Sequence, residues 1–249
     1  FIIARTMKNR GLSAERKNSK ELVITNSNYT KAEVDYTITN QNIKNYFNSA
    51  TQNITILPGF VASSKTGEQT TLGRGGSDFT AAIIAAVLNV EQLEIWTDVS
   101  GMFTTNPKLV KQAYPIDKIS YQEAMELSHF GAKVLYPPTV QPVLSLGIPI
   151  HIKNTLEPGA LGTVISNDKV KSSSPVKGIS NINNIALLTL EGNGMVGIPG
   201  FSKRLFETLS QEKINVIMIT QASSEHSICL GIEDKDANKA KEAIDVIFE

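Results

Sequence analysis

Short apolar segments that suit buried strands alternate with helical segments along the first two thirds of this 249-residue chain. Neighbouring parallel strands need a long crossover, which is usually a helix, so this alternation predicts a mainly parallel sheet sandwiched by helices. The predicted fold class is therefore α/β. The expected strands cover residues 21–25, 54–57, 93–99 and 148–152, and the expected helices cover residues 1–10, 41–50, 79–90, 120–135 and 137–146.

The order of elements changes after a polar, serine-rich stretch at residues 167–175, which has the composition of a linker. We predict two domains, residues 1–171 and residues 172–249. The second part reads strand, helix, strand, strand, helix, one strand short of a ferredoxin-like βαββαβ unit, so we expect an incomplete α+β domain. Because Phe1 to Met7 read as the middle of an amphipathic helix without a capping residue, we expect the chain to be a fragment.

Composition narrows the range of partners. Lys plus Arg equals Asp plus Glu at 24 each, which removes the broad electrostatic reason to expect binding to nucleic acid or to an anionic membrane. The longest apolar runs, such as residues 81–88, are too short to cross a bilayer, and no secretory leader opens the chain. A single cysteine, Cys229, suits a reducing compartment, and the predicted location is cytoplasmic.

The run Gly73-Arg74-Gly75-Gly76-Ser77-Asp78 stands directly before the apolar helix predicted at residues 79–90. Glycines let backbone amides approach an anion, and the helix start adds N–H donors and the positive end of a dipole. Arg74 offers a bidentate fork for a carboxylate or phosphate, while Asp78 can cap the helix or bind a cationic amine. The run predicts a ligand with charges of both signs; a purely structural turn is the alternative.

A second candidate site follows the strand that ends near Thr97. In open α/β sheets ligands bind beyond the carboxyl ends of strands, where Thr97 and Asp98 stand. The turn-rich residues after them supply an aromatic ring in Phe103, several hydroxyls and a cation in Lys108, which suit a nucleotide. A simple turn at Thr97 and Asp98 is the alternative. Lys133, in an otherwise apolar helix end, either reaches solvent or points at a ligand.

Three segments in this order resemble the aspartokinases, members of the amino-acid-kinase family: GRGGSD, WTDVSGMFTTNPK and SYQEAMELSHFGAKVL. Residues 58–166 resemble the second half of the kinase domain, and residues 176–249 resemble the first part of an ACT regulatory region. The stretches SYQEAMELS, PVKGISNINN and ITQASSEHS are most similar to the aspartokinase part of bifunctional aspartokinase/homoserine dehydrogenases.

The resemblance implies transfer of the γ-phosphoryl group of ATP, bound with Mg²⁺, to the β-carboxylate of L-aspartate. This reaction opens lysine, threonine and methionine biosynthesis. No Cys/His cluster in the sequence resembles a zinc site, so we expect metal only as Mg²⁺ with the nucleotide. The residues assigned to aspartate and to the transfer are Arg74, Ser77, Asp78 and Lys133. The residues assigned to the nucleotide are Thr97, Asp98, Phe103, Lys108, Lys133 and Val134.

Two residues depart from the family pattern. Lys108 stands where the family usually has Arg, which keeps the charge but loses the bidentate fork, and Phe103 stands where it usually has Tyr. The family's Lys-Phe-Gly-Gly-Thr segment, whose lysine helps to stabilise the transferring phosphoryl group, has no counterpart in these residues. We therefore expect this chain alone to be inactive.

The second domain suggests regulation. In relatives, amino-acid effectors bind where ACT loops and strands of two subunits pair, which implies a homo-oligomer joined through these regions. The matching positions are Met195, Ile219 and Gln221. Gln221 resembles the glutamine of threonine-sensitive enzymes, so threonine is the expected effector and lysine the alternative. Two other readings stay open: a different amino-acid kinase, and a noncatalytic regulatory chain that binds an amino acid.

Overall fold

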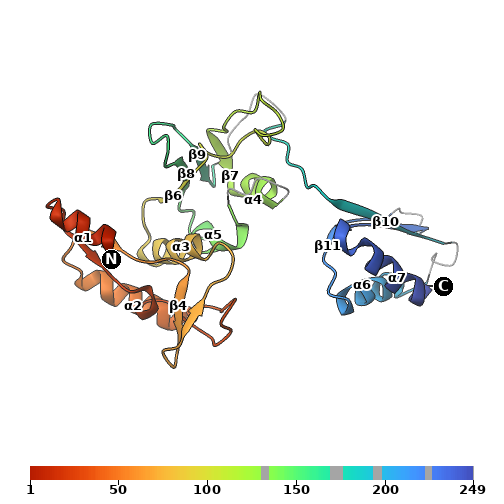
Figure 1. The fold of residues 1–249 in the computed structure, drawn as a ribbon, viewed down its shortest axis with the longest axis horizontal. Helices are drawn as coiled ribbons and strands as arrows, with labels where there is room; N and C mark the ends of the chain where they lie inside the picture. The colour runs from red at the N-terminus through yellow and green to blue at the C-terminus, as the bar shows by residue number, and fades with distance from the viewer. Residues whose placement is uncertain (130–134, 169–175, 193–197, 222–225, 249) are drawn as a thin grey trace. The chain divides into compact units, whose positions relative to one another are not determined.

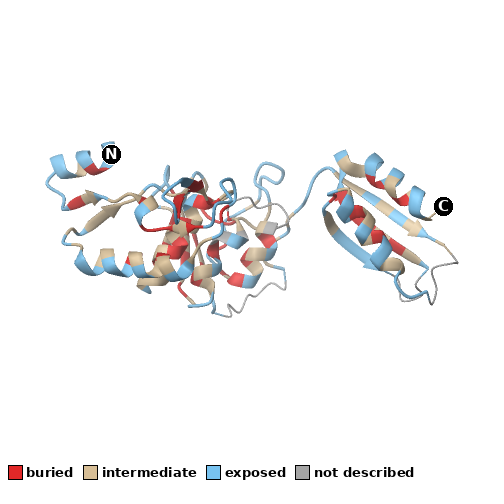
Figure 2. Ribbon diagram, turned by 90° about the horizontal axis from the view of Figure 1, so that it is seen from below, coloured by how far each residue is buried: buried red, intermediate tan, exposed pale blue. Residues whose placement is uncertain are grey.

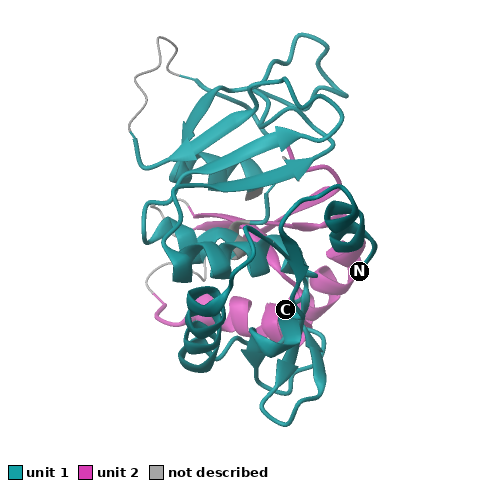
Figure 3. Ribbon diagram, turned by 90° about the vertical axis from the view of Figure 1, so that its left-hand side faces the viewer, with its two compact units in different colours: residues 1–180 teal, residues 181–249 magenta. Residues whose placement is uncertain are grey.

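The computed structural model describes residues 1–129, 135–168, 176–192, 198–221 and 226–248. These residues form two units, residues 1–180 and residues 181–249, which Figure 3 shows in teal and magenta. The predicted boundary between residues 171 and 172 lies outside the described residues, so it stays a prediction. No helix within the described ranges has the length and apolar character needed to cross a membrane.

Unit 1 contains helices and strands in alternation, with one short 3₁₀ helix at Ser19–Glu21 (Figure 1). Its helices are α1 (Ile2–Asn9), α2 (Tyr36–Ser49), α3 (Gly76–Leu88), α4 (Tyr121–His129) and α5 (Pro137–Leu144). Its strands are β1 (Ala14–Arg16), β2 (Ile24–Thr25), β3 (Ile54–Ile56), β4 (Val61–Ser64), β5 (Gln69–Thr71), β6 (Leu93–Thr97), β7 (Lys118–Ser120), β8 (Ile150–Asn154) and β9 (Thr163–Ser166).

The strands of unit 1 pair in three small sheets, β1-β3, β2-β4-β5 and β6-β8-β9-β7. Among the described residues of unit 1, four strand pairs are parallel and two, β4-β5 and β8-β9, are antiparallel, so the predicted mainly parallel α/β arrangement is confirmed. Five strands were not predicted: β1, β4, β5, β7 and β9. Each has only three or four residues, too few to show an alternating apolar pattern against a polar background.

The four-stranded sheet buries alternate residues on one face, including Ile95 of β6 and Ile152 of β8. Residues between them point the other way, so Glu94, Trp96 and Lys153 stay partly exposed. This period of two is what a strand with one packed face produces. The core under the sheet includes residues from α3, α4 and α5, so these helices pack against the sheet that contains β6.

Helix α3 lies between two cores. Ala82 and Ala85 pack with the β6-β8-β9-β7 sheet, whereas Ile83 belongs to a second cluster with Leu22 and Ile43. A helix that is apolar on most of its surface is expected to be buried on more than one side. The rigid placement of α3 fixes the glycine-rich turn at its start.

Several predicted boundaries in unit 1 are wrong, and two of them have a local cause. Helix α2 begins at Tyr36 rather than at residue 41, because the Asp35 side chain accepts a hydrogen bond from the backbone N–H of Ile38 at 3.2 Å and caps it. The strand predicted over residues 21–25 is reduced to β2, since a 3₁₀ turn occupies Ser19–Glu21. Local capping chemistry thus overrides the apolar pattern at both places.

Unit 2 contains β10 (Ile185–Glu191), α6 (Phe201–Gln211), β11 (Val216–Gln221), β12 (Ser227–Glu233), a 3₁₀ turn (Asp234–Asp236) and α7 (Ala237–Phe248). Its strands form an antiparallel sheet in the order β10-β12-β11. Leu205 and Leu209 of α6 pack with Leu230 of β12 and Ile244 of α7, so both helices share one core with the sheet (Figure 2). The predicted α+β, ferredoxin-like order is confirmed.

Candidate functional site

The turn before α3 depends on glycines. Gly73 and Gly75 have φ angles of 74° and 69°, in the left-handed region that favours glycine, and Gly75 is the N-cap of α3. The backbone N–H of Gly76 donates to the carbonyl of Gly73 at 3.1 Å, which closes the turn. Arg74 is exposed between these glycines. The predicted glycine-rich turn at the start of a helix is confirmed.

A second segment, Gly59-Phe60, lies against the start of α3. A Cβ atom added to Gly59 would lie 2.7 Å from the Cα of Ser77, and one added to Gly76 would lie 2.8 Å from the Phe60 ring. The Thr80 hydroxyl accepts from the N–H of Phe60 at 3.1 Å and donates to the carbonyl of Gly76 at 2.8 Å. Phe60 itself has a φ of 74°. The sequence analysis does not single out Phe60, because the positive φ of this residue has no sequence signal.

Arg74 contacts an aromatic ring from α5. Its guanidinium carbon lies 5.2 Å from the ring centroid of Tyr136, within the range of a cation–π interaction. Tyr136 is the N-cap of α5 and follows Leu135. The contact brings the glycine-rich turn next to the start of α5. The predicted residues Lys133 and Val134 lie outside the described residues.

Ser77 and Asp78 form the first turn of α3. Ser77 is exposed, whereas Asp78 is half-buried. Burial raises the pKa of the Asp78 carboxyl above its usual value, although a hydrogen bond from Ser77 acts in the opposite direction. The pair therefore presents a hydroxyl and a partly desolvated carboxyl beside the Arg74 turn.

The second predicted site lies at the carboxyl edge of β6. Thr97 ends this strand and is paired with Asn154 at the end of the parallel strand β8. The Thr97 hydroxyl donates to the Asp98 carboxylate at 3.2 Å. The amide of Asn154, which is buried, donates to the Ser100 hydroxyl at 2.8 Å. Two adjacent parallel strands thus deliver polar groups to one edge of the sheet, as a ligand site in an α/β fold requires.

The loop between β6 and β7, residues 98–117, is anchored at its base by Thr163 of β9. The Thr163 hydroxyl accepts from the N–H of Met102 at 2.7 Å and donates to the carbonyl of Ile116 at 2.6 Å. Met102 is fully buried. Beyond this base Phe103 forms a bridge with Pro115 and is half-buried.

Lys108 lies near the tip of the β6–β7 loop. Its backbone N–H donates to the Asn106 side chain at 3.0 Å, and its side chain is exposed. No hydrogen bond or ion pair between described residues joins the side chains of Thr97, Asp98, Phe103 or Lys108 to those of Arg74, Ser77 or Asp78. The two predicted groups are therefore linked through the shared core of α3 and β6 rather than by direct contact.

Helix α4, which precedes residues 130–134, begins with a capping box. The backbone N–H of Ser120 donates to the Glu123 carboxylate at 3.0 Å, and the backbone N–H of Glu123 donates to the Ser120 hydroxyl at 3.3 Å. Lys177 forms an ion pair with the same carboxylate at 2.7 Å. Burial by itself raises the pKa of Glu123, but the bonds from Lys177 and Ser120 outweigh it and lower the pKa to about 2.

This lowered pKa predicts acid-sensitive stability. The ordinary pKa of 4.5 applies to the unfolded chain, so the stabilisation by ionised Glu123 is fully present above about pH 4.5 and is lost as the pH falls toward about 2. We expect Glu123→Gln to be less stable than the wild type at pH 7 and to lose less stability between pH 5 and pH 3. Urea unfolding followed by the fluorescence of the single tryptophan, Trp96, measures the difference.

The matched control is Glu126→Gln, which removes an exposed carboxylate from the same helix. Its unfolding curves should follow the wild type at each pH. Parallel pH profiles for wild type and Glu123→Gln would contradict the assigned ion pair and capping role.

Unit 2 contains a pocket of ≈ 200 Å³ beside Gln221. Gln221 of β11, Ile228 of β12, Ile198 and the first residues of α6 line it. Helix starts carry N–H groups without intrahelical partners, and these suit a carboxylate. Of the predicted effector residues, Gln221 lines this pocket, Ile219 lies two residues earlier on β11 and is 56% exposed, and Met195 is outside the described residues.

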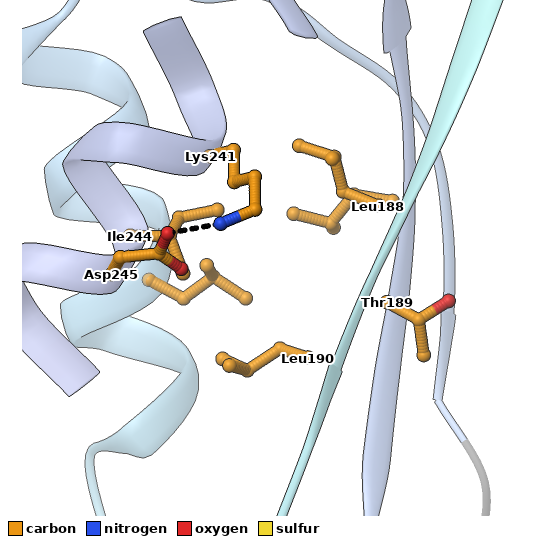
Figure 4. Close-up of a pocket in the computed structure, with 8 residues that line it drawn as sticks. Leu188, Thr189, Leu190, Lys241, Ile244 and Asp245 are labelled. Atoms are coloured by element: carbon orange, nitrogen blue, oxygen red, sulfur yellow. Dashed lines mark hydrogen bonds and ion pairs between the residues drawn. The ribbon is translucent and has the colours of Figure 1, made fainter. Parts of the chain in front are cut away.

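A second pocket, of ≈ 170 Å³, lies between β10 and α7. Figure 4 shows Leu188, Leu190 and Ile244 turned into it and the Lys241–Asp245 ion pair at its side. The side chain of Thr189 lies on the other side of β10. Because its lining is mainly the apolar core of the unit, this pocket offers little polar chemistry for recognising a ligand.

Comparison with known proteins agrees with the two units. A profile of the amino acid kinase family matches residues 2–154, and an ACT domain profile matches residues 188–248. The chain is 38% identical over 253 residues to the chloroplastic bifunctional aspartokinase/homoserine dehydrogenase 1 of Arabidopsis thaliana. That match covers 99% of this chain and 28% of the Arabidopsis protein, so the chain spans only a part of its relative's length.

Solved structures of Escherichia coli aspartokinase III resemble this chain closely. The complex with aspartate and ADP, in the R-state, matches with a TM-score of 0.76 and 33% identity, over 93% of this chain and 52% of that chain. The complex with lysine and aspartate, in the T-state, matches with a TM-score of 0.71 and 32% identity, over 91% and 51%. The amino acid kinase profile covers more than half of this chain, and the ACT profile covers most of unit 2. The chain therefore belongs to the amino acid kinase family and carries an ACT domain.

Proposed function

We propose that this chain is part of an aspartokinase, which transfers the γ-phosphoryl group of ATP to the β-carboxylate of L-aspartate. The observation that carries the proposal is the segment at residues 73–78, which carries Arg74 in the glycine-rich turn before α3 and Asp78 in the first turn of this helix. The E. coli relative that contains aspartate and ADP supports it. The proposed role in biosynthesis is the first step toward lysine, threonine and methionine.

Arg74 is proposed to bind a carboxylate of aspartate. Its guanidinium is exposed to a ligand and is steadied by the Tyr136 ring, which leaves its planar N–H groups available for a bidentate contact. Asp78 suits the ammonium group of the same substrate, and Ser77 adds a hydroxyl. A zwitterion with an extra carboxylate therefore fits the charges that this turn offers.

The nucleotide is proposed to bind at the carboxyl edge of β6. Thr97 and Asp98 supply polar groups there, Phe103 supplies an aromatic ring, and the exposed Lys108 supplies a cation for the phosphates. Lys133 and Val134 are proposed to join this site from the stretch next to Tyr136. Mg²⁺ is proposed to accompany the phosphates, since hard oxygen ligands from a nucleotide are its usual partners in kinases.

An amino acid is proposed to bind the pocket beside Gln221. The amide of Gln221 can bond a hydroxyl or carboxylate, and the start of α6 suits the carboxylate of an amino acid. Threonine is the proposed effector, and lysine, which the E. coli T-state structure contains, is the alternative. The ACT units are proposed to pair into a homo-oligomer. The cytoplasmic location stays a prediction, since the Arabidopsis relative is named chloroplastic.

Aspartyl hydroxamate formation tests the proposal directly. The complete protein is incubated with ATP, Mg²⁺, hydroxylamine and either aspartate or a panel of other carboxylate, carbamate and nucleotide acceptors, and ADP release is measured beside hydroxamate because only acyl phosphates react with hydroxylamine. We expect hydroxamate with aspartate, none with this 249-residue chain alone, and inhibition by threonine. Calorimetric titration of threonine and of lysine then identifies the effector.

The outcomes separate the alternatives. Turnover with another acceptor instead of aspartate would identify a different amino-acid kinase, and amino-acid binding without any turnover would identify a regulatory chain. Binding of lysine but not threonine would refute the proposed effector while leaving the kinase activity in place. Robust turnover by the 249-residue chain would contradict the need for the Lys-Phe-Gly-Gly-Thr segment.

A further inference from the structure

The segment Lys177-Gly178-Ile179 lies near the end of unit 1, just before unit 2 begins at Asn181, and it contacts α4 and the β6–β7 loop of unit 1. The ammonium group of Lys177 lies 2.7 Å and 2.9 Å from the two carboxylate oxygens of Glu123 in α4. The backbone N–H of Ile179 donates to the carbonyl of Thr104 at 2.7 Å. This short segment is therefore held by two residues, Glu123 and Thr104, that stand more than 50 positions before it in the sequence.

Gly178 lies between these two contacts, where there is little room for a side chain. A Cβ atom at this position would lie 3.1 Å from a methyl group of Leu127 and 3.1 Å from the carbonyl oxygen of Thr104. Leu127 belongs to α4, and Thr104 belongs to the β6–β7 loop. The backbone of the segment thus fills the space between the helix and the loop.

Thr104 connects this contact to the predicted nucleotide residues. It directly follows Phe103, and its backbone N–H donates to the carbonyl of Tyr114 across the β6–β7 loop at 2.9 Å. One residue of the loop therefore bonds to Ile179 on one side and to the opposite arm of the loop on the other. The β6–β7 loop is anchored at Thr163. Residues 177–179 add a second connection, because they lie between this loop and α4.

The Lys177 ion pair differs from an ordinary surface pair. The Lys177 side chain is 19% exposed. The Lys65 side chain, which pairs with the helix-capping Asp35 elsewhere in unit 1, is 64% exposed. Exposed pairs contribute little because water screens them, and the loss of solvent around Lys177 makes its pair more sensitive to removal of the partner.

We propose that the docked segment Lys177–Ile179 is a positioning element that holds the β6–β7 loop against α4 in the conformation used for nucleotide binding. The ordering of the loop by this segment rests on the contacts above and not on the proposed function. Its effect on nucleotide affinity rests on the proposed function, because that function places the nucleotide beside Phe103 and Lys108. If undocking lowers the population of the competent loop to about one tenth, the apparent Kd for the nucleotide rises about tenfold.

Two variants disrupt the docking by different means. Lys177→Gln removes the charge, and Gly178→Ala inserts a methyl group between the loop and α4. Lys177→Arg is the conservative variant that keeps the charge, and Lys65→Gln is the matched control because it removes a lysine from another helix-capping carboxylate. All are made in the complete protein, and amide hydrogen exchange and MgADP titration calorimetry are measured.

We expect both disrupting variants to speed exchange of the Ile179 and loop amides about tenfold and to weaken MgADP binding by a similar factor. Exchange in β12 should stay unchanged, Lys177→Arg should retain most of the protection, and Lys65→Gln should match the wild type. Unchanged loop exchange in both disrupting variants would overturn the proposal.

The two parts of the inference can fail separately. Faster loop exchange with unchanged MgADP affinity would overturn the positioning role while confirming the docking. A wild-type protein that binds no MgADP would overturn the proposed function, and hydrogen exchange would still decide whether residues 177–179 order the loop.

Discussion

Replacing Arg74 by Ala is expected to lower kcat/KM for aspartate by about 30-fold to several thousandfold in the complete protein, since losing one partner of a desolvated charge pair costs roughly 2–5 kcal/mol. The guanidinium is the one exposed cation of the glycine-rich turn at residues 73–78, so no neighbouring side chain of that turn can replace it. Steady-state kinetics with ATP held at saturation measures the loss, and nucleotide affinity should change little.

Two further variants sharpen this result. Arg74→Lys keeps the charge but cannot form the planar fork, so it should recover only part of the activity. Arg204 provides the matched control, because its guanidinium lies 4.9 Å from the Phe248 ring in unit 2 and repeats the cation–π arrangement away from the turn. Equal losses for Arg74→Ala and Arg204→Ala would show that general destabilisation, rather than substrate binding, causes the effect.

Replacing Gly101 by Ala is expected to destabilise unit 1 more than any other single methyl addition in this series. Gly101 has a φ of 110°, and an added Cβ would lie 2.4 Å from the Thr163 hydroxyl and 2.9 Å from the Thr163 backbone nitrogen. The backbone strain costs about 1–3 kcal/mol and the overlap about 1–3 kcal/mol more. The same change displaces the Thr163 anchor of the β6–β7 loop, so MgADP affinity should also fall.

Alanine substitutions at two other glycines of unit 1 separate the cost of backbone strain from the cost of atomic overlap. Gly67 has a φ of 87° with no atom within 4 Å of an added Cβ, so Gly67→Ala reports the backbone strain alone. Gly159 has open space and no positive φ, so its Ala variant should match the wild type. Urea unfolding followed by Trp96 fluorescence should rank Gly159→Ala, Gly67→Ala and Gly101→Ala in increasing loss of stability. The same stability for all three would contradict the geometry at Gly101.

Several features could be predicted because their causes are local in the sequence. Ser120 and Glu123 are three residues apart, and a capping box needs only that spacing. The glycine-rich turn before α3 needs only glycines at positions with positive φ and an apolar helix after it. The order of elements in unit 2 followed from runs of strand and helix residues long enough to show their periods.

Other features could not be predicted because residues far apart in the sequence produce them. The strands β1, β7 and β9 are held by partners elsewhere in the chain and carry too few apolar residues to show a pattern. Tyr136 gave no sign that it would stack on Arg74, 62 positions earlier in the chain. The predicted residues Lys133, Val134 and Met195 lie outside the described residues, so their placement stays a prediction.

The amino-acid sequence by itself determined the α/β class, the second α+β unit, the turn that presents Arg74 and Asp78, and the family resemblance, because each depends on neighbouring residues and short spacings. Only the tertiary structure decided that Tyr136 supports Arg74, that Thr163 anchors the β6–β7 loop, and that residues 177–179 dock between this loop and α4. These contacts join residues 47 to 75 positions apart, and such pairing arises from packing of the whole unit rather than from local backbone preference.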